Sequence, residues 1–375
     1  MQTYNSTLKA EEKAVFQLRQ IYGKYGYSQY KMSKFEEYEL YVRNKDFLIS
    51  DSIITFTDTN GKLMALKPDV TLSIIKNTKD EPNCVKKVYY NENVYRIAKG
   101  SHSYKEIMQT GLECLGSVDT YNIFEVLMLA CESLKSISED CVLDVSHLGI
   151  LSNVIDNIGI TEENKSKILK CASEKNVHEI ANICLAQGIA EEKINVLKTV
   201  VSTYGNFEAV ISQLEGIGEE YISKSNLDEL KTIAQSLCSK GYGDMFRIDF
   251  SVINDMNYYN GIVFKGFINN IPTGVLSGGQ YDKLMNKMGK KSKAIGFAVY
   301  LDMLERLENS SRPYDVDTLL LYNENDDLET LNNTISMLTE NGKSVMAQKI
   351  VPEDIKYKQL LKLKDKGVVI LETHA

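Results

Sequence analysis

Polar side chains that could bind a small charged ligand gather within residues 93–116, NVYRIAKGSHSYKEIMQTGLECLG. Arg96 carries a planar guanidinium with five donors, which suits a carboxylate or a phosphate. If the second half of this stretch is a strand, Gln109, Gly111 and Glu113 share one face, because side chains alternate along a strand. These residue types predict a small polar pocket in which Gly111 leaves room for a ligand. The same pattern also fits an ordinary hairpin with a solvated polar face, and this stretch alone leaves both interpretations open.

The elements that would position these groups are predicted by the neighbouring residues. Residues 93–98 and 107–115 are rich in β-formers and flank a Gly/Ser/Lys-rich turn. Upstream, Asn60-Gly61 joins two further β-runs and is a strong short-range signal for a hairpin. Asp69 follows that hairpin and can cap the helix expected after it.

The composition is that of a globular protein of two or three domains. The chain has 375 residues, 43% of them hydrophobic, and no apolar run approaches the roughly 18 residues that a membrane span needs. The N-terminal segment lacks the basic and apolar regions of a signal peptide. Seven cysteines are scattered without a CxxC pair and the four histidines are isolated, so we expect reduced thiols in the cytoplasm and no metal site. Acidic residues outnumber basic ones by 51 to 43, which favours small-molecule or protein partners over nucleic acid.

The order of patterns predicts a strand-rich core interrupted by helices. Helical periodicity marks residues 8–26 and 120–134, and residues 36–42 read as a short helix. From about residue 150 to 240 the pattern changes to consecutive helices, which we interpret as an insertion into the core. The helices expected there span residues 162–174, 177–187, 191–202 and 226–239. Further strands are expected at residues 27–32, 85–90, 141–147, 245–250, 261–268 and 274–276.

The C-terminal part reads as a separate unit. Residues 310–315, SSRPYD, form the best candidate linker. Beyond them, strand and helix patterns alternate, with a second helix expected at residues 356–364. This 314–375 unit holds 11 acidic and seven basic residues, which argues against a role in nucleic-acid binding.

Four separated segments of the chain resemble histidyl-tRNA synthetase, in order and with similar separations. They are LKPDVT (66–71), the hairpin at residues 93–116, INDMNYYNGIVF (253–264) and GGQYDKL…AIGFAVYLDML (278–304). The resemblance covers about residues 8–310. It implies an α+β fold with the antiparallel sheet of a class II aminoacyl-tRNA synthetase flanked by helices. The core would span residues 1–310 with its helical insertion, and the 314–375 unit resembles a shortened anticodon-binding domain.

The resemblance also implies a histidine pocket, because the matching positions keep their polar groups. Asp69 stands where the family has Glu, and the carboxylates of Asp69 and Glu113 can take an ammonium group or an imidazole N–H. Arg96 can take a carboxylate, and the tyrosines offer hydroxyls and an aromatic wall. The predicted histidine-binding residues are Asp69, Thr71, Arg96, Gln109, Glu113, Tyr258, Tyr259 and Tyr281.

Positions that match the synthetase's activation chemistry depart from the family pattern. Ala98 stands for the motif 2 Glu, Met303 for the motif 3 Arg, Asn254 and Gln280 for two further Arg, Asp255 for a Gly, and Ser33 for the motif 1 Pro. Losing cations near transferring phosphates forfeits electrostatic stabilisation that is commonly the largest catalytic contribution. The departures therefore predict a site that binds histidine without activating it, with no catalytic residue and no cofactor.

These departures point to a paralogous family, the regulatory subunits of ATP phosphoribosyltransferase, and KLMALKPDVTLSI (62–74) is especially similar to it. That resemblance implies a non-catalytic subunit in the first step of histidine biosynthesis, which activates a short catalytic subunit and mediates feedback inhibition by bound histidine. It also implies a dimer within a hetero-octamer, with no membrane and no tRNA as partner. Two alternatives stay open. One is a working synthetase with replacement cations from Lys99, Lys105 or Lys293, and the other is a stand-alone amino-acid-binding module.

Overall fold

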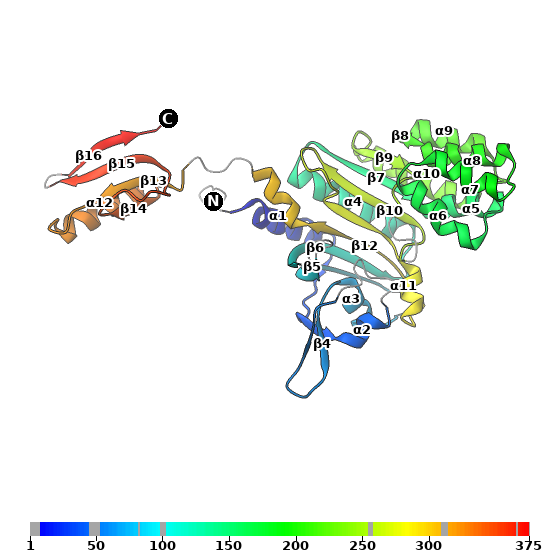
Figure 1. The fold of residues 1–375 in the computed structure, drawn as a ribbon, viewed down its shortest axis with the longest axis horizontal. Helices are drawn as coiled ribbons and strands as arrows, with labels where there is room; N and C mark the ends of the chain where they lie inside the picture. The colour runs from blue at the N-terminus through cyan, green and yellow to red at the C-terminus, as the bar shows by residue number, and fades with distance from the viewer. Residues whose placement is uncertain are drawn as a thin grey trace. The chain divides into compact units, whose positions relative to one another are not determined.

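The computed structural model describes residues 8–44, 53–81, 83–97, 103–253, 258–308, 314–364 and 367–374. The chain divides into two compact units, Met1–Arg306 and Leu307–Ala375 (Figure 1). Within the described residues, none of the helices combines the length and the apolar character needed to cross a membrane.

A mixed sheet of nine strands in the described part of the chain forms the centre of the first unit. Across the sheet the strands are β1 (Ser28–Gln29), β5 (Val85–Ile97), β6 (Tyr104–Gly116), β12 (Lys293–Tyr300), β11 (Leu276–Gln280), β10 (Ile262–Ile268), β7 (Cys141–His147), β9 (Phe246–Asp249) and β8 (Tyr204–Gly205). Neighbouring strands from β5 to β7 are all antiparallel, while β1–β5 and β7–β9 are parallel. This arrangement confirms the predicted α+β class with an antiparallel central sheet.

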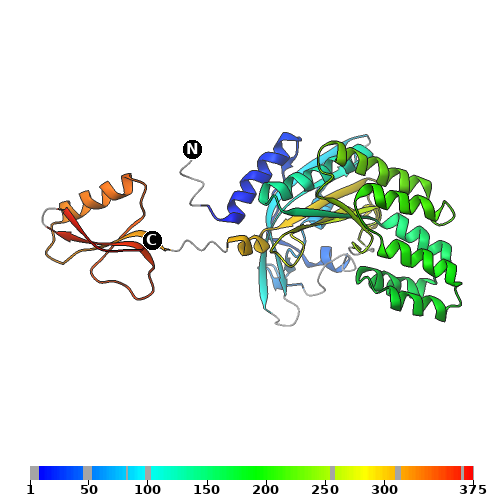
Figure 2. The same ribbon diagram turned by 90° about the horizontal axis from the view of Figure 1, so that it is seen from above.

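Two long helices cover one face of this sheet. Helices α1 (Ala10–Lys24) and α4 (Thr120–Ile137) contact each other, α1 packs on β5 and β6, and α4 packs on β7, β10 and β12 (Figure 2). Asp119 fixes the start of α4, because its carboxylate accepts from the Asn122 amide at 3.0 Å while the Asn122 side chain accepts from the Asp119 amide. The opposite face is left for the polar residues of the candidate site.

The predicted helical insertion lies between β7 and β9 (Figure 1). Its helices are α5 (Leu148–Ile158), α6 (Glu162–Ser173), α7 (Val177–Ala186), α8 (Glu191–Ser202), α9 (Phe207–Ile217) and α10 (Lys224–Ser239). Those expected at residues 162–174, 177–187, 191–202 and 226–239 are confirmed to within two residues at each end. Helices α5 and α9 were not predicted. Helix α5 starts directly after β7 without a turn residue, and the His147 side chain caps it by accepting from the Ile150 amide at 3.3 Å.

A smaller three-stranded sheet precedes the site. It has the order β2 (Phe35–Glu37), β4 (Leu63–Leu66), β3 (Thr55–Thr57), and the helices α2 (Tyr38–Val42) and α3 (Thr71–Asn77) follow β2 and β4. The predicted hairpin at Asn60-Gly61 is confirmed, with Gly61 at φ 79° and the Asp58 carboxylate accepting from the amides of Asn60 and Lys62. The helix expected at residues 36–42 is shorter, because its first residues pair in β2.

Several other strand predictions need correction. The two runs expected at residues 85–90 and 93–98 are one continuous strand, β5, paired along its whole length with β6. The strand expected at residues 274–276 lies further along the chain as β11, which includes Gly278 and Gly279, and the strand expected at residues 27–32 is reduced to β1. The short helix α11 (Asp282–Lys287) follows β11, and a 3-10 helix, η3 (Leu301–Glu308), follows β12.

In its described residues, the second unit has a four-stranded sheet and one helix. The strand order is β14 (Val345–Gln348), β13 (Val316–Leu321), β15 (Tyr357–Lys364), β16 (Gly367–Thr373), and α12 (Leu328–Glu340) lies between β13 and β14 in the chain. The helix predicted at residues 356–364 is wrong, since this segment is strand β15. The spacing of its leucines fits both the period of a helix and the period of a strand. Parallel pairing with β13 decides the outcome, because it sends Leu361 and Leu363 together into a core with Leu320 and Leu338.

Candidate functional site

Glu113 is a buried carboxylate at the centre of the site. It lies on β6 with 2% of its surface exposed. One carboxylate oxygen accepts from the Thr71 hydroxyl at 2.8 Å, and the other accepts from the Tyr281 hydroxyl at 2.6 Å. Burial raises the pKa of Glu113 to about 8, and the neighbouring Asp69 adds to the rise, while the two hydroxyl donors oppose it. In the described part of the chain, no cation forms an ion pair with this carboxylate.

Asp69 supplies a second carboxylate at the start of helix α3. Its Oδ1 accepts from the Leu72 amide at 2.9 Å and so satisfies a free amide in the first turn of the helix. The N-cap position itself is occupied by Val70 and not, as expected, by Asp69. Burial raises the pKa of Asp69, and the Leu72 amide and the Arg96 charge partly offset this rise. Thr71 is the first residue of the same helix and reaches Glu113, so one helical turn places both Asp69 and a donor to Glu113.

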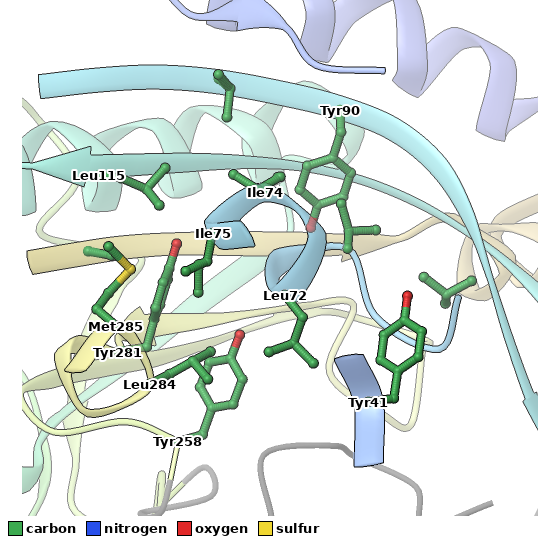
Figure 3. Packing of buried hydrophobic residues seen from close by; sticks show 14 of the residues in the cluster. Tyr41, Leu72, Ile74, Ile75, Tyr90, Leu115, Tyr258, Tyr281, Leu284 and Met285 are labelled. Carbon is green, nitrogen blue, oxygen red and sulfur yellow. The ribbon is translucent and has the colours of Figure 1, made fainter. Parts of the chain in front are cut away.

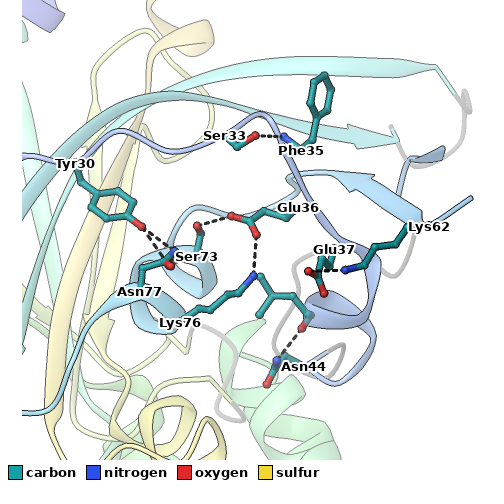
Figure 4. A network of polar contacts seen from close by, with 11 residues as sticks. Tyr30, Ser33, Phe35, Glu36, Glu37, Asn44, Lys62, Ser73, Lys76 and Asn77 are labelled. Atoms are coloured by element: carbon teal, nitrogen blue, oxygen red, sulfur yellow. Dashed lines mark hydrogen bonds and ion pairs between the residues drawn. The ribbon is translucent and has the colours of Figure 1, made fainter. Parts of the chain in front are cut away.

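Helix α3 is held in place by a polar network on its far side. Glu36 accepts from the Ser73 hydroxyl at 2.9 Å and from the Lys76 ammonium at 3.1 Å, and the Asn77 side-chain amide donates to the Tyr30 hydroxyl (Figure 4). These contacts join α3 to Glu36 of β2 and to Tyr30, which directly follows β1, so the turn that carries Asp69 and Thr71 has a fixed support.

Arg96 reaches the same turn from strand β5. Its Nε donates to the Pro68 carbonyl at 3.1 Å, and its charge acts on the neighbouring Asp69. Gln109 lies on β6 with 4% of its surface exposed, opposite Glu92 on β5 and Tyr300 on β12. Arg96 and Gln109 therefore belong to the same face of the sheet as Glu113.

Three of the predicted tyrosines line the wall around these groups. The ring centroids of Tyr258 and Tyr259 are 4.6 Å apart, and those of Tyr258 and Tyr281 are 5.7 Å apart. Figure 3 shows Tyr258 and Tyr281 beside Leu72 and Ile75 of α3, in one cluster of buried residues. All eight predicted residues are thus described, and the fold brings them together at one end of α3.

Glycines make room for these side chains. A Cβ on Gly296 would lie 1.8 Å from Glu113 Oε2, and a Cβ on Gly279 would lie 2.7 Å from the Tyr259 ring. The space above Gly111 is taken by the Tyr90 hydroxyl, which would be 2.4 Å from a Cβ there. The expectation that Gly111 leaves room for a ligand therefore needs correction, because the room is filled by a tyrosine of the chain itself.

Sequence reasoning missed Tyr90 and Tyr300, two tyrosines of the site whose pKa values are raised in part by the Asp69 carboxylate. Burial raises the pKa of each of these tyrosines, and Glu113 adds to the rise at Tyr90. The signal for Tyr90 was its position opposite Gly111 in the β5–β6 register, which became visible only once the two strands were known to pair.

The positions that depart from the synthetase pattern make local contacts. Gln280 accepts from the Ile262 amide at 2.6 Å, Met303 accepts from the Thr273 hydroxyl through its sulfur, and Ser33 accepts from the Phe35 amide. Ala98, Asn254, Asp255 and Lys99 lie outside the described residues. Among the residues that are described, no three His, Cys, Asp or Glu side chains cluster as metal ligands.

Comparison with known proteins places this geometry in a family. The model of the histidyl-tRNA synthetase family matches residues 3–304. A curated relative, the ATP phosphoribosyltransferase regulatory subunit of Bacillus cereus (strain AH187), is 25% identical over 342 residues, which are 88% of this chain and 80% of the relative.

Solved structures share the fold over most of the chain. An ATP phosphoribosyltransferase regulatory subunit/histidyl-tRNA synthetase from Bacillus halodurans C has a TM-score of 0.74 at 22% identity, covering 94% of this chain and 93% of its own. Histidyl-tRNA synthetase from Nostoc sp. PCC 7120 has a TM-score of 0.71 at 17% identity, covering 94% of this chain and 87% of the synthetase chain. A chain of the ATP phosphoribosyl transferase (HisG:HisZ) complex from Thermotoga maritima has a TM-score of 0.61 at 20% identity, covering 77% of this chain and 96% of its own length. As the four sequence segments predicted, the chain belongs to the histidyl-tRNA synthetase family.

Proposed function

We propose that this chain is a regulatory subunit of ATP phosphoribosyltransferase in the first step of histidine biosynthesis. It would activate a short catalytic subunit and would carry bound histidine as the signal for feedback inhibition. The observation that carries the proposal is Glu113, a buried carboxylate with two hydroxyl donors and no ion-pair partner among the described residues. The curated relatives with this name support the assignment of the partner.

The chemistry of the site favours an amino acid with a second basic group. A buried carboxylate without a cation is poorly stabilised, so a ligand ammonium or imidazole N–H at Glu113 would supply the missing donor. Arg96 and Gln109 offer donors to a ligand carboxylate, and Tyr258 and Tyr259 offer an aromatic wall. Histidine has a basic group for Glu113, a carboxylate for Arg96 and Gln109, and a ring that can pack against the tyrosines. Asp69, Thr71 and Tyr281 would complete the pocket.

We further propose that catalysis resides in the partner subunit and that this chain needs no cofactor. Gln280 is committed to the Ile262 amide, and Met303 brings a thioether where an adenylate-forming site would need a cation. The alternative is a histidyl-tRNA synthetase-like enzyme with a diverged ATP site. The fold that this chain shares with the Nostoc synthetase is compatible with that alternative.

The proposed assembly is a dimer of this chain within a hetero-octamer that includes the short catalytic subunit. The Thermotoga maritima structure supports a partner of this kind, because it is a complex of HisG with HisZ. We place the assembly in the cytoplasm, where the seven free thiols of this chain would stay reduced.

Direct binding tests the site assignment. Titration calorimetry of the purified chain with histidine should give a saturable heat, and Glu113→Gln should weaken binding by about 1.5–3 kcal/mol, the usual value of a hydrogen bond to a charged group. The matched control is Glu106→Gln on the same strand, where the carboxylate is exposed and bonded to Asn93 and Tyr95. Equal affinity in both variants would refute the pocket, and histidine-dependent pyrophosphate exchange with ATP would favour the synthetase alternative.

A further inference from the structure

A fully buried lysine lies beside the candidate site, and none of the groups assigned to ligand binding uses it. Lys67 has 0% of its surface exposed, and its ammonium group forms an ion pair with Glu92, whose side chain is 16% exposed. The Glu92 carboxylate also accepts from the Met32 amide at 3.4 Å. Burying a charged pair costs desolvation free energy, so such a pair needs a reason beyond stability.

The backbone around Lys67 does not depend on this ion pair. The Tyr95 amide donates to the Lys67 carbonyl at 2.9 Å, and the Lys67 amide donates to the Lys34 carbonyl at 3.1 Å. These two bonds tie the segment that leads into Asp69 to its neighbours, whatever side chain stands at position 67. The side chain of Lys67 is therefore free to serve an electrostatic purpose.

The location of Glu92 indicates what that purpose is. Glu92 lies directly opposite Gln109 in the β5–β6 register, and Glu92 and Arg96 fall on the same face of β5 because side chains alternate. Side chains directly opposite each other have Cβ atoms about 5 Å apart. An unpaired Glu92 would thus hold a negative charge next to the donors that we assign to a ligand carboxylate.

We propose that Lys67 is a positioning residue of the candidate site, which acts by neutralising Glu92 so that Gln109 and Arg96 can accept an anionic carboxylate. The inference rests on the proposed function, because it assumes that the ligand is an amino acid whose carboxylate lies at this end of the site. It assigns to Lys67 and Glu92 opposite effects on ligand affinity, although both belong to one ion pair.

Histidine titration of three variants of the full chain tests whether Lys67 acts by neutralising Glu92. Lys67→Met leaves Glu92 unpaired and should weaken histidine binding about tenfold or more through repulsion of the carboxylate. Glu92→Gln removes the negative charge and should leave binding unchanged or make it tighter. The double variant Lys67→Met with Glu92→Gln should bind within about threefold of the unmodified chain, since neither charge remains. Lys62→Met is the matched control, because Lys62 forms an exposed ion pair with Glu37.

The signs of the effects separate this role from a purely structural one. If the ion pair only holds the fold, each single variant leaves one buried charge unpaired, so both Lys67→Met and Glu92→Gln should weaken binding, and this pattern would overturn the inference. Unchanged binding in Lys67→Met would overturn it as well. If the unmodified chain does not bind histidine, the proposed function fails and the inference fails with it, whereas binding by the unmodified chain with the wrong signs in the variants refutes the inference alone. Circular dichroism of each variant confirms that affinities are compared between folded chains.

Discussion

Glu113 determines the electrostatics of the candidate site at the scale of single residues. The carboxylate is surrounded by hydroxyl donors and by the acidic Asp69, and burial raises its pKa to about 8 from a usual value of 4.5. Near neutral pH the unliganded site therefore holds a proton on Glu113. A ligand that brings a cation to Glu113 would favour the charged form and displace that proton.

This proton has a consequence for stability. Between about pH 4.5 and about pH 8 the folded chain binds one more proton at Glu113 than the unfolded chain. The free energy of unfolding of the first unit should therefore fall as the pH rises through this range, by at most about 1.4 kcal/mol per pH unit from this group. The loss should level off above about pH 8.

Urea unfolding of the unmodified chain and of Glu113→Gln, without histidine, measures this effect. The stability of the variant relative to the unmodified chain should increase from about pH 6 to about pH 8, because other titrating groups contribute equally to both chains. A difference that stays constant with pH would show that Glu113 is ionised in the unliganded site.

Histidine binding should also reveal the proton on Glu113, because the bound cation would displace it. If histidine presents a cationic group to Glu113, binding should release a proton below about pH 8, and affinity should rise as the pH increases from about 6 to about 8. Calorimetry in two buffers of different ionisation enthalpy measures the released proton. Binding without proton release near neutral pH would contradict the assignment of Glu113 as the cation acceptor.

At the scale of elements, the sequence predicted the parts of the site that depend on local patterns. The alternation Gln109, Gly111, Glu113 on one face of β6 and the hydrogen bond from the first turn of α3 to Asp69 are both local, and both are present. The contacts of Tyr90 and Tyr300 depend on strand register and on the order of strands across the sheet, which no local pattern specifies. The helix wrongly expected at residues 356–364 failed for the same reason, since pairing with β13 overrides an ambiguous pattern of leucines.

Close packing between β6 and β12 predicts a strict requirement for glycine. A Cβ at Gly296 would lie 1.8 Å from Glu113 Oε2 and 2.5 Å from the Leu112 carbonyl, which belongs to the backbone and cannot move aside. Gly296→Ala should therefore lower the free energy of unfolding by about 1–3 kcal/mol and abolish histidine binding.

A glycine far from the site provides the control for this substitution. Gly216 lies in helix α9 with no atom within 4 Å of an added Cβ, so Gly216→Ala should be neutral or raise stability by up to about 1 kcal/mol. Thermal unfolding and histidine titration of both variants check the prediction. Normal binding by Gly296→Ala would mean that the Glu113 carboxylate does not lie against Gly296 in the liganded site.

At the scale of the whole molecule, the chain consists of two units with separate cores. The second unit has its own cluster around Leu320, Leu338, Leu361 and Leu363, and its 314–375 segment is acidic. All eight residues of the candidate site belong to the first unit. The histidine site is therefore expected to function without the second unit.

Removal of residues 309–375 tests this division of roles. The shortened chain should stay folded and should bind histidine with an affinity within about threefold of the full chain, because no side chain of the site is lost. Calorimetry of the two chains side by side makes the comparison. A large loss of affinity in a folded shortened chain would assign the second unit a part in ligand binding.

The most direct test of the regulatory role is the rate of phosphoribosyl-ATP formation by a short catalytic subunit from the same organism. The rate is measured with the catalytic subunit alone, with this chain added, and with this chain and histidine added. We expect activation by this chain and its reversal by histidine, with the reversal lost in Glu113→Gln while activation remains. No change in rate when this chain is added would contradict the proposed function.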